Sequence, residues 1–400
     1  MPSQTAPPTR PWVRGVNLGG WLVMERYITP YQFAITECHL RGDFCWYPGQ
    51  LSAPDKDSPD YQLCDLDKCP PARTNGPFRD TPDFPLDEWT LAQAFDDPQI
   101  ASDWLDHHLL NFVQKSDLDT LVQAGVTHVR IPIPHFILGN VVQDEPWVPG
   151  NRWVHFVRFC HWARSVGIQV WPDVHTAPGS QNGFDNSGEQ LQSGVSCKGW
   201  SDNATHVERS LQVIRDVTAA AVRDGIDDVV TGFGLINEPF KDCDRKVVNK
   251  FMEDGLLVVR ETLGADTSVY VSDLFLAKTF NGKGWWTNPV NYNNTYLDSH
   301  YYHGTCRYQV SSCIIILLVH LPPPNQPTVS FLLHGFLQSL RKDPEHSVPA
   351  NTLPTFVRTN GATQPCVVTT SGRTKTSLVR ASSAWWVNGV RPTMSCRLPC

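Results

Sequence analysis

The chain has 400 residues, of which 41% are hydrophobic and 10% aromatic, enough to form one large barrel or two smaller domains. Its formal net charge of −7 argues against nucleic acid as a partner, because proteins that bind polyanions carry excess basic charge. The charge is unevenly distributed: residues 1–302 have a net charge of −14, and residues 303–400 have +7, with Asp343 and Glu345 as the only acids there. Basic binding arms are usually richer in Lys and Arg and poorer in Ile, Leu and Pro than this segment.

The ends and apolar runs of the chain bear on its location. Met1–Arg10 has no apolar core, so we expect no secretory signal peptide there. The longest apolar run, Ile314–Val319, is too short to cross a bilayer, so we expect no membrane span. Twelve cysteines favour an oxidising compartment, whereas the missing signal argues against export, and the compartment stays open at this stage.

Short β-rich runs alternate with helical and loop patterns through the first 302 residues. Six strands are expected, at Val13–Leu18, His128–Ile133, Gln169–Val174, Thr231–Ile236, Ser268–Val271 and Tyr296–Tyr302. Helical patterns lie between them, at Asp117–Ala124, Trp153–Val166 and Val207–Arg223. No Gly-rich phosphate loop follows a strand, which argues against a doubly wound nucleotide-binding sheet. The sequence therefore predicts an α/β fold, a (β/α)8 TIM-type barrel with six recognisable units and with strands seven and eight missing or replaced.

A long insertion at about residues 36–85 interrupts this alternation. It is rich in Pro, Asp and Gly and contains Cys38, Cys45, Cys64 and Cys69. The spacings between these cysteines do not match the tight pairs of a zinc module, so two disulfides within the insertion are expected, with their pairing open.

The alternation of strands and helices stops after residue 302. Residues 303–400 contain Pro322–Pro324, scattered Ser and Thr, and almost no acids. We therefore divide the chain into a barrel domain at 1–302 and an aberrant, disordered tail at 303–400. The abrupt charge inversion favours a frame change or a retained intron in the gene model over a natural disordered extension.

Polar residues follow or end the predicted strands. They are Glu25, Arg130, His175, Asn237, Glu238, His300 and Tyr302. Barrel enzymes place their reactive groups at the carboxyl ends of the strands, where the loops converge. This set is polar and flanked by aromatic residues, which suits a neutral polyol such as a sugar, and it offers no cationic clamp for phosphate.

Five motifs occur in order along the chain. They are Arg14–Glu25 (RGVNLGGWLVME), Arg130–Ile133 (RIPI), Asp173–His175 (DVH), Ala177–Gly188 (APGSQNGFDNSG) and Gly234–Pro239 (GLINEP). Together they resemble glycoside hydrolase family 5, in its fungal exo-β-1,3-glucanase branch. The resemblance extends from about Trp12 to Tyr302.

The resemblance implies roles for individual residues. Glu238 matches the general acid/base, which needs a raised pKa that Phe233, Leu235 and Ile236 would provide by desolvation. Asn237 matches the residue that binds the sugar 2-hydroxyl, and Phe184 an aromatic at the substrate entrance. The remaining matches line the sugar pocket or position the catalytic pair: Glu25, Arg130, His175, Asn186, His300 and Tyr302.

The resemblance also implies an activity. The chain is expected to cleave β-1,3-glucan from non-reducing ends by a retaining double displacement, without a cofactor. Its expected partner is a β-glucan polysaccharide or oligosaccharide. By resemblance, it would act as a monomer outside the cell or in the cell wall.

Structural roles remain open for several of these residues. Glu238 would otherwise be a helix cap or a surface acid, and Arg130 a partner for purely structural acids. His175 and Tyr302 would otherwise be core residues. His300, His303 and Asp298 do not follow a known metal-ligand spacing, so no metal site is predicted.

One part of the family pattern is missing. The family's nucleophile is a Glu in a Gly-Glu-Trp-Ser-like motif at the end of the seventh strand, and no such motif occurs here. Three hypotheses follow: a glucan hydrolase by descent with an altered C-terminal part, a non-catalytic β-glucan-binding relative, or an interaction protein that uses its basic tail.

Overall fold

The fold is described from a computed structural model. It describes residues 13–46, 61–65, 67–69, 85–276, 294–302, 314–320 and 328–333, the last ones from residue 301 on by their backbone alone. All of these belong to one compact unit, Met1–Phe336. Most of the predicted tail at 303–400 lies outside the described residues.

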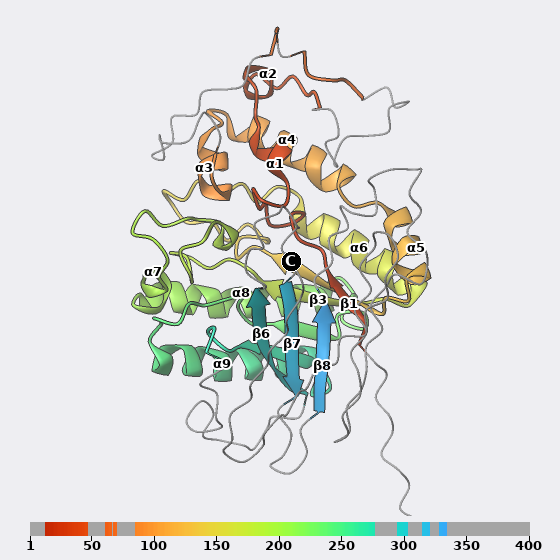
Figure 1. Ribbon diagram of the computed structural model, residues 1–400, viewed down its shortest axis with the longest axis vertical. Helices are drawn as coiled ribbons and strands as arrows, with labels where there is room; N and C mark the ends of the chain where they lie inside the picture. The colour runs from red at the N-terminus through yellow and green to blue at the C-terminus, as the bar shows by residue number, and fades with distance from the viewer. Residues whose placement is uncertain are drawn as a thin grey trace, which may run out of the picture. The chain divides into compact units, whose positions relative to one another are not determined.

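An eight-stranded sheet forms the centre of this unit, with the strands in chain order. The strands are β1 (Gly15–Asn17), β2 (His128–Ile133), β3 (Gln169–Val174), β4 (Gly232–Gly234), β5 (Ser268–Ser272), β6 (Thr295–Tyr302), β7 (Ile314–His320) and β8 (Thr328–Leu333). The first six pair in parallel, as strands joined by helices do. β7 then pairs antiparallel with β6, and β8 antiparallel with β7. The last three strands of the sheet, β6, β7 and β8, lie side by side in Figure 1.

The predicted fold class is confirmed. β2 and β3 begin and end at the predicted residues, and the other four predicted strands differ by one to three residues at their ends. The two antiparallel strands replace the parallel seventh and eighth strands of a complete barrel. β7 and β8 were not predicted, and they lie beyond the proposed domain boundary at residue 302.

Residues alternate between the two faces of the parallel strands, as the period of two requires. On β2, Val129 and Ile131 are fully buried in apolar surroundings, whereas Arg130 between them contacts polar residues of other strands. An aromatic group lies nearer the amino ends of the strands: Trp171 of β3 packs on Tyr270 of β5, with ring centroids 4.6 Å apart. The polar site therefore has an aromatic layer beneath it.

Close packing inside the sheet requires glycine on β4. A Cβ at Gly234 would lie 2.4 Å from Oδ1 of Asp173, and one at Gly232 would lie 2.6 Å from the ring of Trp171. Because a Cβ does not approach other atoms this closely, larger residues would displace Asp173 and Trp171.

The helices are α1 (Pro30–Phe33), α2 (Glu37–Leu40), α3 (Glu88–Gln93), α4 (Pro98–Asn111), α5 (Lys115–Gln123), α6 (Arg152–Val166), α7 (Lys198–Ser201), α8 (Ala204–Arg223) and α9 (Arg245–Leu263), with a 3-10 turn η1 (Asp185–Ser187). α8 buries Leu211, Ile214 and Val217, which recur at helical spacing. Side chains at Asn203 and Asp244 cap α8 and α9 by accepting backbone N–H groups. No helix among the described residues is long and apolar enough to cross a membrane.

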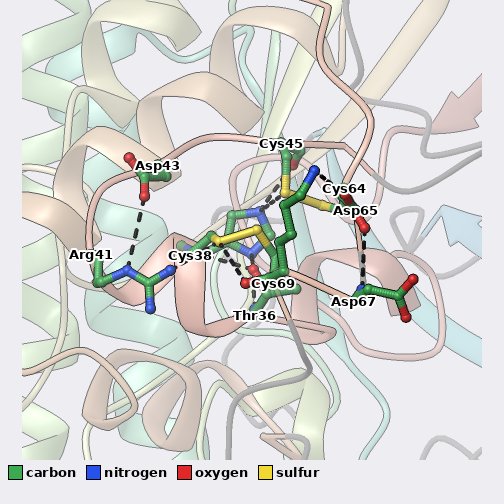
Figure 2. The surroundings of a disulfide bond; sticks show 11 residues. Thr36, Cys38, Arg41, Asp43, Cys45, Cys64, Asp65, Asp67 and Cys69 are labelled. Atoms are coloured by element: carbon green, nitrogen blue, oxygen red, sulfur yellow. Dashed lines mark hydrogen bonds and ion pairs between the residues drawn. A yellow bond between two sulfur atoms is a disulfide. The ribbon is translucent and has the colours of Figure 1, made fainter.

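The insertion is held by two disulfides, as predicted. The pairing left open by the sequence is nested: Cys38 bonds Cys69, and Cys45 bonds Cys64 (Figure 2). A third disulfide, Cys197–Cys243, was not predicted and joins the segment before α7 to the segment before α9.

Candidate active site

Glu238 lies just beyond the end of β4, where its carboxyl group is buried and held from two sides. Its Oε2 accepts a hydrogen bond from Nδ2 of Asn186 at 2.9 Å, and its Oε1 lies 2.6 Å from Nδ1 of His300. The residue is 5% exposed and has a φ of 48°, in the left-handed region that non-glycine residues seldom adopt. Backbone strain of this kind is typical of functional positions.

The amides of two neighbouring side chains hold the backbone at this strained position. Nε2 of Gln181 donates to the carbonyl oxygen of Asn237 at 2.9 Å, and Nδ2 of Asn182 donates to that of Glu238 at 3.2 Å. Both come from the loop after β3, which therefore fixes the direction of the Glu238 side chain.

His300 of β6 bridges two carboxylates. Its Nδ1 faces Glu238, and its Nε2 lies 3.2 Å from Oδ2 of Asp298. Burial lowers the pKa of His300, but the charges of Asp298 and Glu238 outweigh burial and raise this pKa from 6.5 to about 10. A proton therefore remains on the ring, next to Glu238, through the neutral pH range.

Arg130 of β2 lies at the centre of the site. Its Nη2 donates to Oδ1 of Asn237 and pairs with Oδ2 of Asp173, both at 2.9 Å, and its Nη1 donates to Oδ1 of Asn17 at 3.1 Å. Burial alone would raise the pKa of Asp173, but Arg130 and then His175 outweigh it and hold this pKa below its usual value. The charge of Arg130 is thus matched by a carboxylate that stays ionised.

His175 connects Asp173 to Asn237. Its Nδ1 lies 2.7 Å from Oδ2 of Asp173, and its Nε2 lies 3.3 Å from Nδ2 of Asn237. The ring donates through Nδ1, because the carboxylate of Asp173 only accepts hydrogen bonds. With both its amide atoms bonded, Asn237 has a fixed orientation.

Glu25 reaches the same site from the loop after β1. Burial raises its pKa to about 7, and the nearby acids Asp185 and Glu238 add to this while His175 opposes it. At neutral pH, Glu25 is therefore present in both its protonated and its ionised form, so it can donate or accept a hydrogen bond.

The model of Cellulase (glycosyl hydrolase family 5) matches residues 93–328, which is more than half of the chain. The chain belongs to glycosyl hydrolase family 5. The resemblance inferred from the five motifs is thereby confirmed at the level of the family.

Two relatives of this family 5 chain are named glucan 1,3-beta-glucosidases. One, "Probable glucan 1,3-beta-glucosidase A" of Aspergillus clavatus, is 30% identical over 73% of this chain and 55% of its own length. "Glucan 1,3-beta-glucosidase 2" of Wickerhamomyces anomalus is 30% identical over 72% of this chain and 56% of its own length. The chain thus spans little more than half the length of these relatives.

A solved structure shares the fold. The rutinosidase from Aspergillus niger aligns with a TM-score of 0.53 at 20% identity, covering 74% of this chain and 71% of that protein. This likeness supports the barrel architecture of the family 5 chain.

The structure brings most of the predicted site residues of this family 5 chain together. Glu238 is in contact with Asn186 and His300, and Arg130 and His175 with Asn237, while Glu25 interacts electrostatically with Glu238. Phe184 lies on the loop before Asn186, and its ring meets that of Phe240 edge-on at 6.0 Å. The backbone of Tyr302 ends β6, and its side chain lies outside the described residues.

Several site residues were not predicted as such. Asn17, Asp173, Gln181, Asn182 and Asp298 all bond members of the site. Asn17 and Asp173 lie inside the motifs. Asp173 is two residues before His175, and Asp298 is two residues before His300. Since side chains two residues apart on a strand share a face, this spacing would have placed the two acids on the face that carries the site.

Only one cluster among the described residues has the composition of a metal site, and it lies in the insertion. His39, Cys45 and Cys64 bring their ligand atoms within 4.8 Å of one another. The two sulfurs are bonded to each other, so they do not offer the thiolates that a metal ion requires.

Proposed function

We propose that this chain recognises the non-reducing end of a β-1,3-glucan and that Glu238 is the general acid/base of a retaining glycosidase site. The observation that carries the proposal is the buried Glu238 carboxyl group, held between Asn186 and His300 at the end of β4. The names of the relatives supply the substrate class, and the polar character of the site agrees with it.

In a complete retaining site, Glu238 would give a proton to the glycosidic oxygen while a second carboxylate bonds the anomeric carbon and the glycosidic bond breaks. His300 faces this carboxyl group, with its Nδ1 2.6 Å from Oε1 of Glu238. In the second half of that reaction, ionised Glu238 would take a proton from the water that displaces the second carboxylate from the sugar, which restores the acid.

Asn237 would bind the 2-hydroxyl group of the sugar. Its amide is held by Arg130 and His175, so the group is oriented before the substrate arrives. Glu25, with a pKa of about 7, would hydrogen-bond another hydroxyl group. An oriented set of this kind lowers the cost of ordering the substrate and its partners.

A second candidate function, binding without turnover, is favoured by one observation. A retaining site needs a nucleophilic carboxylate about 5–5.5 Å from the acid/base. The strands that follow β6 have the sequences IIILLVH and TVSFLL, with no Asp or Glu. Asp343 and Glu345, the only acids after Asp298, lie outside the described residues. We therefore expect the 400-residue chain to bind glucan and to turn it over poorly.

Location and assembly belong to the same proposal. Three disulfides support an oxidising compartment, such as the cell exterior or the cell wall. We also propose that the protein is a monomer. Light scattering of the purified protein tests this.

Calorimetry with laminari-oligosaccharides tests the binding proposal. The expected result is binding at sub-millimolar to millimolar sugar that Asn237→Ala weakens by about tenfold, the loss typical of a bond to a buried polar group. Glu208→Gln, a substitution of an exposed residue on α8, serves as the control. Absence of binding at millimolar sugar would refute the function.

A further inference from the structure

Three consecutive residues at the start of α3 contact both loops that carry the candidate site. Asp87, Glu88 and Trp89 directly follow the insertion, and each bonds a different backbone group outside its own helix. One of the two loops follows β1 and carries Glu25. The other follows β3 and carries Phe184 and Asn186.

Glu88 and Arg152 hold the loop with Glu25. Oε2 of Glu88 accepts the N–H of Met24 at 3.0 Å, and its Oε1 pairs with Nη2 of Arg152. Nε of Arg152 donates to the carbonyl oxygen of Leu22 at 2.8 Å. The ion pair therefore binds the backbone on both sides of Val23, immediately before Glu25.

Asp87 and Trp89 hold the second loop. Oδ2 of Asp87 accepts the N–H of Gln190 at 2.6 Å, and the N–H of Trp89 donates to the carbonyl oxygen of Gly188 at 2.9 Å. These bonds lie two and four residues after Asn186, whose side chain holds Glu238. The ring of Trp89 adds an edge-on contact with Trp147 at 4.9 Å.

The burial of the ion pair argues for a role in geometry. Arg152 is fully buried and Glu88 is 4% exposed. The desolvation of a buried pair commonly cancels its attraction, so apolar residues of similar size would stabilise the fold as well. Apolar residues would not supply the hydrogen bonds to the backbone of Leu22 and Met24, and these bonds set the path of the chain into Glu25.

We propose that Asp87 and Glu88 are positioning residues of the pocket, with Glu88 and Arg152 setting Glu25, and Asp87 setting the loop of Asn186. The inference deepens the proposed function, since its sugar-binding consequence rests on that function. The geometry of the two loops does not rest on it.

Hydrogen exchange, read by mass spectrometry on the full chain without sugar, tests the geometry. Glu88→Gln keeps an acceptor for Met24 but loses the charge that holds Arg152, and should speed exchange about tenfold in residues 22–29 alone. Asp87→Asn keeps the cap of α3 but loses the acceptor for the N–H of Gln190, and should speed exchange about tenfold in residues 183–191 alone. Each variant thus controls for the other.

Glu145→Gln is a matched control for the loss of an ion pair. It breaks the partly buried pair with Arg209 on α8, which bonds neither loop, and should leave exchange in both loops unchanged. Unchanged exchange in its own loop for either test variant, or an increase spread evenly over the helices, would overturn the positioning role.

A double-mutant cycle on sugar affinity tests the consequence. Glu88→Gln should weaken laminaritriose binding about fivefold, and Glu25→Gln with Glu88→Gln should bind no more weakly than Glu25→Gln alone, because Glu88 acts through Glu25. If the losses of sugar affinity from the two substitutions are additive, Glu88 does not act through Glu25. If the wild-type chain binds no sugar, the proposed function fails, and the exchange experiment still decides the positioning role.

Discussion

Strands β2, β3 and β6 differ from strands β7 and β8 in what they bring to the sheet. In the first group, apolar residues alternate with Arg130, Asp173 and Asp298, so that one face packs on helices and the other forms the site. β7 is an unbroken apolar run ending in His320, and it pairs antiparallel with β6. Parallel pairing with a helical crossover brings the carboxyl end of each strand to one edge, whereas an antiparallel hairpin reverses that direction. The active site of a barrel therefore depends on strand direction as well as on residue type.

The largest expected effect comes from replacing residues 303–400 with two parallel strands that carry a Gly-Glu-Trp-Ser-like motif. Hydrolysis of β-1,3-glucan should rise on the order of 10⁴-fold, because the covalent route needs the second carboxylate. Glucose release from laminarin measures it. Glu238→Gln in the restored protein should remove most of the gain, and equal hydrolysis by the unaltered chain would contradict the comparison.

Removal of the buried cation on β2 should lower stability. Arg130→Met leaves Asp173 and Asp298 buried without their cation, and should lower the free energy of unfolding by roughly 3–5 kcal/mol. Urea denaturation measures the loss. Arg164→Met, which removes a surface pair with Asp228, should cost no more than about 1 kcal/mol. Similar losses in both variants would show that Arg130 does not organise the site.

The stability of the chain should also depend on pH through His300 on β6. The pKa of His300 is raised to about 10, so the folded state binds its proton more tightly than the unfolded state does. The resulting stabilisation is complete below about pH 6.5 and is lost as the pH rises through about 10. Urea denaturation should show that the free energy of unfolding of the wild-type chain falls by roughly 2 kcal/mol or more across this pH range, and that His300→Gln lacks this fall. An unchanged pH profile would contradict the His300 bridge.

The smallest effect is expected beyond β8. Truncation after Leu333 removes a segment that lacks the strand and helix pattern of residues 1–302, and should change the free energy of unfolding by less than about 1 kcal/mol. Limited proteolysis should cut this segment before any other. Protease resistance of the segment after Leu333, or a large loss on truncation, would contradict this expectation.

The parallel strands and most of the site were predictable because their information is local. His128–Ile133 and Gln169–Val174 combine buried apolar positions with a following turn, and the motifs around Glu25, Asn186 and Glu238 lie directly after strands. Asp298 was missed as a site residue because no motif marks it, and only the neighbouring strands show what it faces. The role of Asp87 and Glu88 was invisible for a similar reason, since their partners are backbone groups on distant loops.

By itself, the sequence determined the repeating units, the family pattern and the lack of a nucleophile motif, because each depends on residues close together in the chain. Only the tertiary structure decided which cysteines pair, how His300 lies between Glu238 and Asp298, and which way β7 runs. Each of these depends on contacts between residues far apart in the chain or between strands. A residue type and its spacing do not fix such contacts, since they follow from the packing of the whole sheet.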